Sequence, residues 1–289
     1  MPVCVADPSA SMHCIEGNLH GQIAWVHRRQ ASMVIWDEPA LLLVDSGLPS
    51  DTFNKVARAR LTLESCSEEI GRVAGYFKAV GRPFAWWVGP SSRPLDIEER
   101  LQEMGFCATE LTTGMRLQLH ELREAPLPTG LQVLRVSSLR HLEHLSCMLA
   151  ENWDPPDSAV APFYQAAAAL ILQPQSAMRY FVAYLDGEPA AVSGLYLEGG
   201  VGGIYSVATR RQFRRRGIGA RLTWAAADEA RRAGAVLAVL QAAPEGKEIY
   251  QRLGFQDCCV FAEYTPAGQA AANEVSTRQA VPRRERRAE

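Results

Sequence analysis

The segment with the clearest chemical potential is Arg214-Arg-Arg-Gly-Ile-Gly219, between an expected strand and an expected helix. A helix N-terminus already carries about half a positive charge, so each exposed arginine there is unfavourable by about 0.3–1 kcal/mol. The two glycines leave backbone amides open to a ligand. The spacing fits neither a Walker A loop nor a dinucleotide fingerprint. We therefore expect an anion to bind here; the alternative is a solvated arginine run before a surface helix.

The elements that position this segment follow from hydrophobic periodicity and turn residues. Asp186-Gly187 supplies the positive φ angles of a tight hairpin turn. We expect, in order, strand 132–136, helices 138–152 and 162–172, strands 180–185, 190–197 and 204–208, helix 217–233, strand 236–240, helix 245–253 and strand 255–261. Hairpins combined with crossovers predict an α/β fold with a mixed sheet flanked by helices.

Three motifs in this part of the chain, in their order along the sequence, resemble those of the GNAT acetyltransferase superfamily. Arg214, Gly217 and Gly219 match its pyrophosphate-binding signature. Val207-Ala208-Thr209 is similar to its splayed fourth strand, and Tyr250-Gln-Arg-Leu-Gly-Phe255 to its downstream motif. The resemblance covers residues 132–265 and implies acetyl-CoA as co-substrate, without a metal. The implied coenzyme-binding residues are Val207, Ala208, Thr209, Arg214, Arg215, Arg216, Gly217, Ile218, Gly219 and Ala220.

The same resemblance implies a role for Tyr250 as general acid toward the departing coenzyme A thiolate. A phenol has a reference pKa near 10, against about 8.5 for a thiol, so it is protonated at neutral pH. The alternative is a tyrosine that packs beside a core face defined by Ile249 and Leu253. One departure lies seven residues upstream, where the family often has an asparagine and this chain has Ala243.

The first half of the chain repeats part of this pattern. Residues 84–89 and 98–106 read as strand, loop, short helix, Gly-Phe and strand, as do residues 236–255. The first half lacks the Arg-x-x-Gly-x-Gly signature and has Leu101 in place of Tyr250. We therefore expect one coenzyme site per chain. The first half is expected to shape the acceptor pocket or to complete a pseudo-dimer.

Composition divides the chain into four parts. The two prolines and the glycine of residues 123–130 indicate a linker, because they interrupt helices and central strands. We expect a degenerate GNAT-like domain at residues 1–122 and a catalytic GNAT domain at residues 131–266. Residues 267–289 carry little to bury and are expected to be a disordered tail.

Bulk properties argue against several other functions. A formal net charge of −2 provides no field to recruit nucleic acid or anionic lipid. The seven cysteines form no disulfide-like framework, and the start does not resemble a signal peptide, so we expect a cytoplasmic protein. His141 and His144 share a helix face, but no further ligand completes a metal site.

The prediction is an acyltransferase that moves an acetyl group from acetyl-CoA to an amine by direct attack. The acceptor is unidentified, and the general base is open among Tyr205, Ser206, Glu198 and a water relay. Trp153 and Tyr164 either line the acceptor pocket or pack in the core. The alternatives are a non-catalytic coenzyme A sensor, which would not need Tyr250, and an interaction protein. We expect a monomer, as a pseudo-dimer of domains, or a homodimer.

Overall fold

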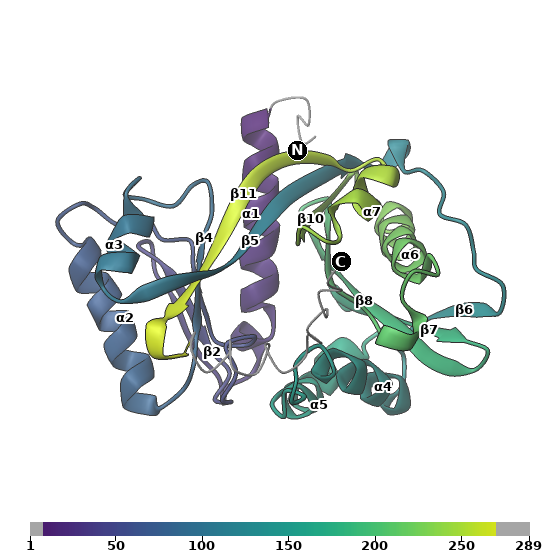
Figure 1. The fold of residues 1–289 in the computed structure, drawn as a ribbon, viewed down its shortest axis with the longest axis horizontal. Helices are drawn as coiled ribbons and strands as arrows, with labels where there is room; N and C mark the ends of the chain where they lie inside the picture. The colour runs from purple at the N-terminus through teal and green to yellow at the C-terminus, as the bar shows by residue number, and fades with distance from the viewer. Residues whose placement is uncertain (1–7, 270–289) are drawn as a thin grey trace, which may run out of the picture.

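One mixed sheet runs through both halves of the protein in the computed structural model, which describes residues 8–269. Helices flank this sheet, as the sequence predicts, and the fold class is confirmed (Figure 1). Within the described residues the strand order is β1-β2-β3-β4-β11-β5-β10-β9-β8-β7-β6.

The first half of the chain supplies the elements from α1 to β5. Their bounds are α1 (Pro8–Trp25), β1 (Val34–Asp37), β2 (Leu42–Asp45), β3 (Lys55–Ala57), α2 (Cys66–Val80), β4 (Ala85–Val88), α3 (Ile97–Glu103) and β5 (Phe106–Gln118). Residues 123–130, the expected linker, contain neither helix nor strand.

The second half follows the predicted order of strands and helices. Its elements are β6 (Leu131–Arg135), α4 (Leu139–Ala150), α5 (Val160–Ile171), β7 (Met178–Leu185), β8 (Glu188–Glu198), β9 (Val201–Thr209), α6 (Ile218–Arg232), β10 (Leu237–Ala242), α7 (Lys247–Arg252) and β11 (Gln256–Pro266). Ser138 begins α4 as its side chain accepts a hydrogen bond from the His141 amide. The predicted tail lies outside the described residues from residue 270 onward.

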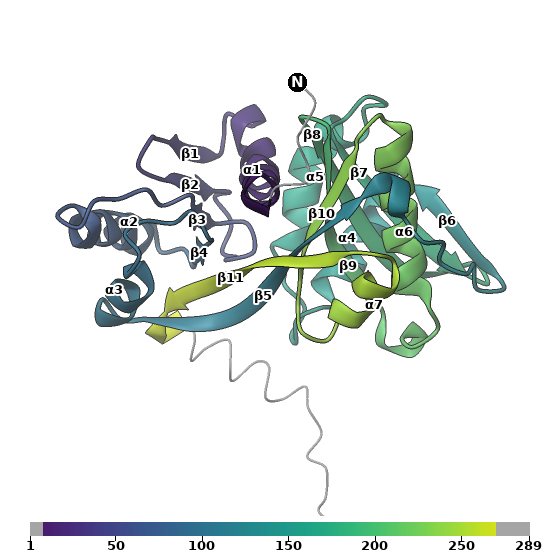
Figure 2. The same ribbon diagram turned by 90° about the horizontal axis from the view of Figure 1, so that it is seen from above.

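The two halves exchange their last strands. β5 lies between β11 and β10, and β11 lies between β4 and β5. In Figure 2 both strands run side by side from one half to the other. Met115 and Leu117 of β5 are buried in the apolar cluster of the second half, and Tyr264 of β11 is buried in that of the first half. Each exchanged strand therefore completes the core of the other half.

α1 stands at the centre of the molecule, against strands of both halves (Figure 1). Asn18 on this helix donates hydrogen bonds to the carbonyls of Tyr196 and Val201, each at 3.4 Å. A Cβ atom at Gly203 would lie 1.8 Å from the Asn18 Oδ1. The glycine therefore permits this close approach of helix and strand. Gly203 itself belongs to β9, which begins at Val201, three residues before the strand expected at 204–208.

Candidate functional site

Strands β9 and β10 separate in the middle of the sheet. They pair in parallel only over residues 201–203 and 237–239. Beyond Gly203, the edge of β9 that faces β10 pairs with no strand of residues 8–269. Backbone amides on this edge are therefore open to a ligand, and Val207, Ala208 and Thr209 all lie on the separated part of the strand.

A bulge in β9 lies just beyond the place where the strands diverge. The pairing with β8 shifts register between Val192 and Gly194, so that β9 contains one extra residue. Ser206 lies in the bulge with a φ of 53°, in the left-handed region that non-glycine residues seldom adopt. The bulge redirects the backbone of the next residues, which include Val207.

The arginine and glycine segment lies between the end of β9 and the first turn of α6. Gly217 is the N-cap of this helix, and its φ of 76° is accessible to glycine at little cost. Ile218 is buried and anchors the helix start, whereas the neighbouring Gly219 and Ala220 are half-buried. Arg214 Nε donates a hydrogen bond of 3.0 Å to the Thr209 carbonyl, which ties the segment to β9.

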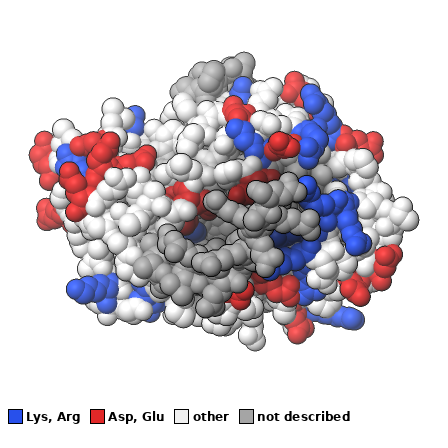
Figure 3. All heavy atoms as spheres, in the orientation of Figure 1, with Lys and Arg blue, Asp and Glu red and all other residues white. Residues whose placement is uncertain are grey.

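Three exposed arginines surround this helix start. Arg214, Arg215 and Arg216 make no ion pair with any carboxylate of residues 8–269, in contrast to Arg210, which binds Glu151 at 2.7 Å. Figure 3 shows Lys and Arg side chains gathered over the half of the molecule that contains α6. Cations beside a positive helix end are favourable when an anion lies between them. The three arginines and the start of α6 are therefore suited to bind a phosphate group.

Tyr250 lies on α7, in the loop-and-helix connection that follows β10. Its ring is partly buried in the same apolar cluster as Val207 and Ala220, and it packs edge-on against Phe255 at 6.2 Å. Burial raises the pKa of Tyr250 to about 12. The phenol is therefore fully protonated at neutral pH, and its hydroxyl has no hydrogen-bond partner in the described part of the chain.

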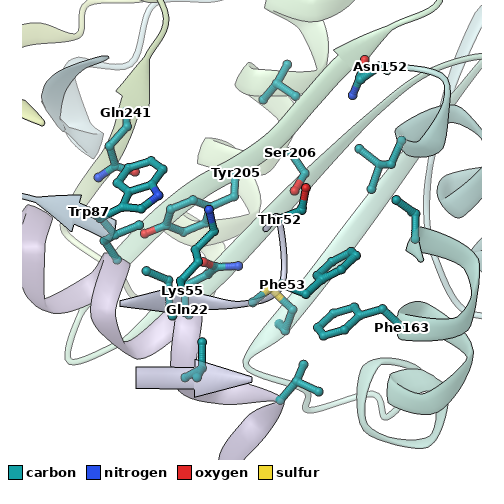
Figure 4. Close-up of a pocket in the computed structure, with 18 of the residues that line it drawn as sticks. Gln22, Thr52, Phe53, Lys55, Trp87, Asn152, Phe163, Tyr205, Ser206 and Gln241 are labelled. Atoms are coloured by element: carbon teal, nitrogen blue, oxygen red, sulfur yellow. The ribbon is translucent and has the colours of Figure 1, made fainter. Parts of the chain in front are cut away.

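A cavity of about 340 Å³ opens beside the diverging strands and is lined by both halves of the chain. Figure 4 shows its interior. The second half contributes Ser206 and Val207 from one strand arm, and Gln241 and Ala243 from the other. From the first half come Phe53, in the loop before β3, and residues of α1, β3, β4 and β5, among them Gln22, Lys55, Trp87, Glu110 and Thr112. The volume lies within the range of small-molecule pockets.

The two ends of the cavity differ in character (Figure 4). At one end lie Lys55, Trp87, Tyr205 and Gln241, and the Tyr205 hydroxyl donates a hydrogen bond of 2.7 Å to Asn18 Oδ1. At the other end the rings of Phe53 and Phe163 stack with their centroids 3.9 Å apart. A molecule with one polar group and one apolar part is therefore the best match to this lining.

Comparison with known proteins identifies the second half. Residues 140–255 match the model of the acetyltransferase (GNAT) family. Residues 140–255 therefore form a GNAT acetyltransferase domain. The GNAT family uses acetyl-CoA as co-substrate. No curated protein matches the sequence.

Solved structures share the fold over most of the chain. A GCN5-related N-acetyltransferase from Kribbella flavida is 18% identical with a TM-score of 0.68, over 87% of this chain and 95% of that one. Another, from Sphaerobacter thermophilus, is 14% identical with a TM-score of 0.58, over 90% and 93%. A tandem GNAT protein from the clavulanic acid biosynthesis pathway is 14% identical with a TM-score of 0.54, over 78% and 77%.

The GNAT domain brings most of the predicted site residues into one region. The splayed strand, the arginine segment and α6 are consecutive, and Tyr250 shares their apolar cluster. Trp153, Tyr164, Tyr205 and Ser206 all line the cavity, as the sequence allowed. Glu198 lines a separate hollow beside α1 instead, because it ends β8 on the far side of the bulge.

Sequence reasoning missed the cavity residues of the first half. Lys55, Trp87 and Glu110 lie on three different strands of the shared sheet. Residues 84–89 were predicted to form a strand, yet no local signal showed that Trp87 on this strand faces the second half. Leu101, at the position that corresponds to Tyr250, is fully buried in an apolar cluster and offers no proton.

Two further features concern metals and membranes. No group of three or more His, Cys, Asp or Glu side chains that could hold a metal ion occurs within residues 8–269. His144 Nδ1 instead lies 2.7 Å from the Tyr184 hydroxyl. Among the helices of the same residues, none has both the length and the apolar character of a membrane-spanning segment.

Proposed function

We propose that the chain is an N-acetyltransferase that moves the acetyl group of acetyl-CoA to an amine held in the cavity between the two halves. The observation that carries this proposal is the position of the cavity. It opens where β9 and β10 separate, and the unpaired arginines lie at the other end of the same strand. A coenzyme-binding surface and an acceptor cavity therefore adjoin along one backbone segment.

The coenzyme-binding roles follow from the chemistry of each part. The guanidinium groups of Arg214, Arg215 and Arg216 and the free amides at Gly217 to Ala220 bind the pyrophosphate. Backbone amides of residues 207–209 orient the pantetheine arm and donate to the thioester carbonyl oxygen. A donor at that oxygen stabilises the negative charge that develops during attack, and such donors contribute about 10²–10³-fold to turnover.

The acetyl transfer proceeds by direct attack. The amine nitrogen bonds to the carbonyl carbon, the carbon–sulfur bond breaks, and the sulfur leaves as a thiolate. Tyr250 donates its phenolic proton to this thiolate. The pKa of about 12 ensures that Tyr250 carries its proton at neutral pH, and the proton lost by the amide nitrogen restores the phenol.

The shared cavity supports a single chain as the functional unit. Both halves contribute to its lining, and the exchanged strands hold the halves in register. One chain would therefore bind one acetyl-CoA and one amine, in the manner of a pseudo-dimer of domains.

A thiol-release screen with purified full-length chain tests the proposal. Acetyl-CoA is supplied with polyamines, amino acids, amino sugars, arylalkylamines and peptide N-termini, and the acetylated product is identified by mass spectrometry. Amine-dependent thiol release with a matching amide is the expected result. Tight acetyl-CoA binding without transfer to any of these amines would favour a sensor, and absence of binding would remove the coenzyme assignment.

A further inference from the structure

A row of polar side chains crosses the sheet at the polar end of the cavity. Trp87 of β4, Glu263 of β11 and Glu110 of β5 are directly paired in the register of three neighbouring strands. Directly opposed residues of antiparallel strands project from the same face of a sheet. Lys55 of β3 extends over this row, with its Nζ 4.9 Å from the Trp87 ring centre and 3.3 Å from Glu263 Oε2.

The charges in this row do not balance. Lys55 neutralises Glu263, but Glu110 has no hydrogen-bond or ion-pair partner within residues 8–269. Two carboxylates therefore face one ammonium group. Partial burial raises the pKa of Glu110, repulsion from Glu263 and Glu245 adds to the rise, and Lys55 opposes it. Like charges directly opposed on a sheet are unfavourable, and a bound cation would relieve the repulsion.

Glu110 is also placed to meet a ligand. It lines the cavity and remains accessible to solvent. Glu110 lies on β5, which pairs with β10 from Thr113 onward. Thr113 is paired with Ala242, and the next residue of the chain after Ala242 is the cavity residue Ala243. The carboxylate therefore lies near the end of the β10 arm, where the thioester is proposed to lie between β9 and β10.

The far end of the cavity is mainly aromatic, with a few polar side chains such as Thr52 and Ser206 beside the rings. Phe53 and Phe163 form its stacked aromatic wall, and Tyr164 and Met178 are buried beside them. His27 lines this region and is buried, and burial lowers its pKa to about 4. At neutral pH the imidazole is therefore uncharged and does not add a second cation to the cavity.

We propose that the acceptor is a primary amine on an apolar, ring-sized body, and that Glu110 binds its ammonium group and accepts its proton. The amine then attacks the thioester carbonyl carbon; a carbon–nitrogen bond forms, the carbon–sulfur bond breaks, and the proton on Glu110 passes to solvent. This proposal rests on the proposed acetyl transfer. Polyamines fit less well, because Glu110 is the only carboxylate among the described residues that line the cavity. Amino sugars fit less well, because the stacked rings of Phe53 and Phe163 match an apolar body better than a body that carries several hydroxyls.

Acetyl transfer to a graded amine series tests the substrate class. The full-length chain is assayed for kcat/KM with 2-phenylethylamine, hexylamine, spermidine and glucosamine. The two apolar amines are expected to exceed the other two by at least about tenfold, from the burial of their apolar part alone. Higher kcat/KM for spermidine or glucosamine would overturn the proposed acceptor class, while acetyl transfer itself would stand.

The variant Glu110→Gln tests whether the carboxylate of Glu110 binds the ammonium group. The control is Glu245→Gln, which removes a nearby exposed charge outside the cavity lining. Loss of a hydrogen bond to a charged group predicts a fall of about 10- to 100-fold in kcat/KM for 2-phenylethylamine at neutral pH. The control is expected to match the wild type, and Glu110→Asp, which keeps the charge, should recover part of the activity.

The pH dependence separates proton transfer from a structural defect. An alkylamine titrates near pH 10, like a lysine side chain, so it needs no base in alkaline solution. The deficit of Glu110→Gln should therefore shrink as the pH rises toward 10. A deficit that is the same at every pH, or wild-type kcat/KM at neutral pH, would overturn the role of Glu110. A wild-type chain that does not bind acetyl-CoA would instead overturn the proposed function.

Discussion

Gly217 offers a test of the coenzyme site in which charge is the only variable. Its φ of 76° excludes most side chains, but asparagine and aspartate tolerate this region better than other residues. A Cβ atom at Gly217 would meet no other atom within 4 Å. Gly217→Asn and Gly217→Asp should therefore fold equally, each with a backbone strain of about 1 kcal/mol.

The expected loss of affinity follows from the position of the new carboxylate. It would lie at the first turn of α6, about 5 Å from a phosphate bound by the neighbouring amides. Two unit charges at that separation repel by about 1–3 kcal/mol for an effective dielectric constant between about 80 and 20. Since 1.4 kcal/mol is a factor of about ten, acetyl-CoA affinity should fall by about 5- to 150-fold for Gly217→Asp.

Calorimetric titration with acetyl-CoA measures this difference, and thermal unfolding confirms equal stability of the two variants. Gly217→Asn should bind close to the wild-type affinity. The gap between the variants should narrow as salt is added, because the site is exposed and salt screens the repulsion. Equal affinity of the Asn and Asp variants at low salt would refute the placement of a phosphate at α6.

Three further predictions concern catalysis, packing and pH. Tyr250→Phe should leave acetyl-CoA affinity and melting temperature unchanged, because its hydroxyl has no partner in the described residues, while kcat falls by about 10²-fold; unchanged kcat would leave it a packing residue. Gly203→Ala should lower stability by about 1–3 kcal/mol through its clash with Asn18, and the added change Asn18→Ala should restore part of it in thermal unfolding. His27, whose pKa falls from 6.5 to about 4 on folding, is protonated first in the unfolded chain. Stability should therefore decline as the pH drops from about 6.5 to 4, by up to about 3 kcal/mol, and His27→Gln should flatten that decline.

The coenzyme-binding region was accessible to sequence reasoning because its signals are local. The arginines, the glycines and the strand and helix on either side of them lie within one short segment. Each signal has a physical cause that needs no distant partner: a positive φ at Gly217, a helix start, and a strand before it. The mixed sheet and the order of elements in the second half were confirmed for the same reason.

The acceptor cavity could not be predicted, because it depends on which strands pair. The alternation of apolar and polar residues along 106–118 or 256–266 defines the two faces of a strand. It does not determine which other strand pairs with it. The exchange of β5 and β11 brings Glu110 and Trp87 to the second half, and nothing local encodes that exchange. α1 was also missed. It lies between both halves, so its apolar and polar residues are not segregated on two faces.

The most direct test of the account is a crystal structure of the full chain with a non-hydrolysable acetyl-CoA analogue. We predict one analogue per chain, its pyrophosphate against Gly217 and Gly219, and its carbonyl oxygen accepting a hydrogen bond from a backbone amide of residues 207–209. The acetyl group should face the cavity between the halves. An analogue bound along β3 and β4, or two analogues per chain, would contradict the assignment.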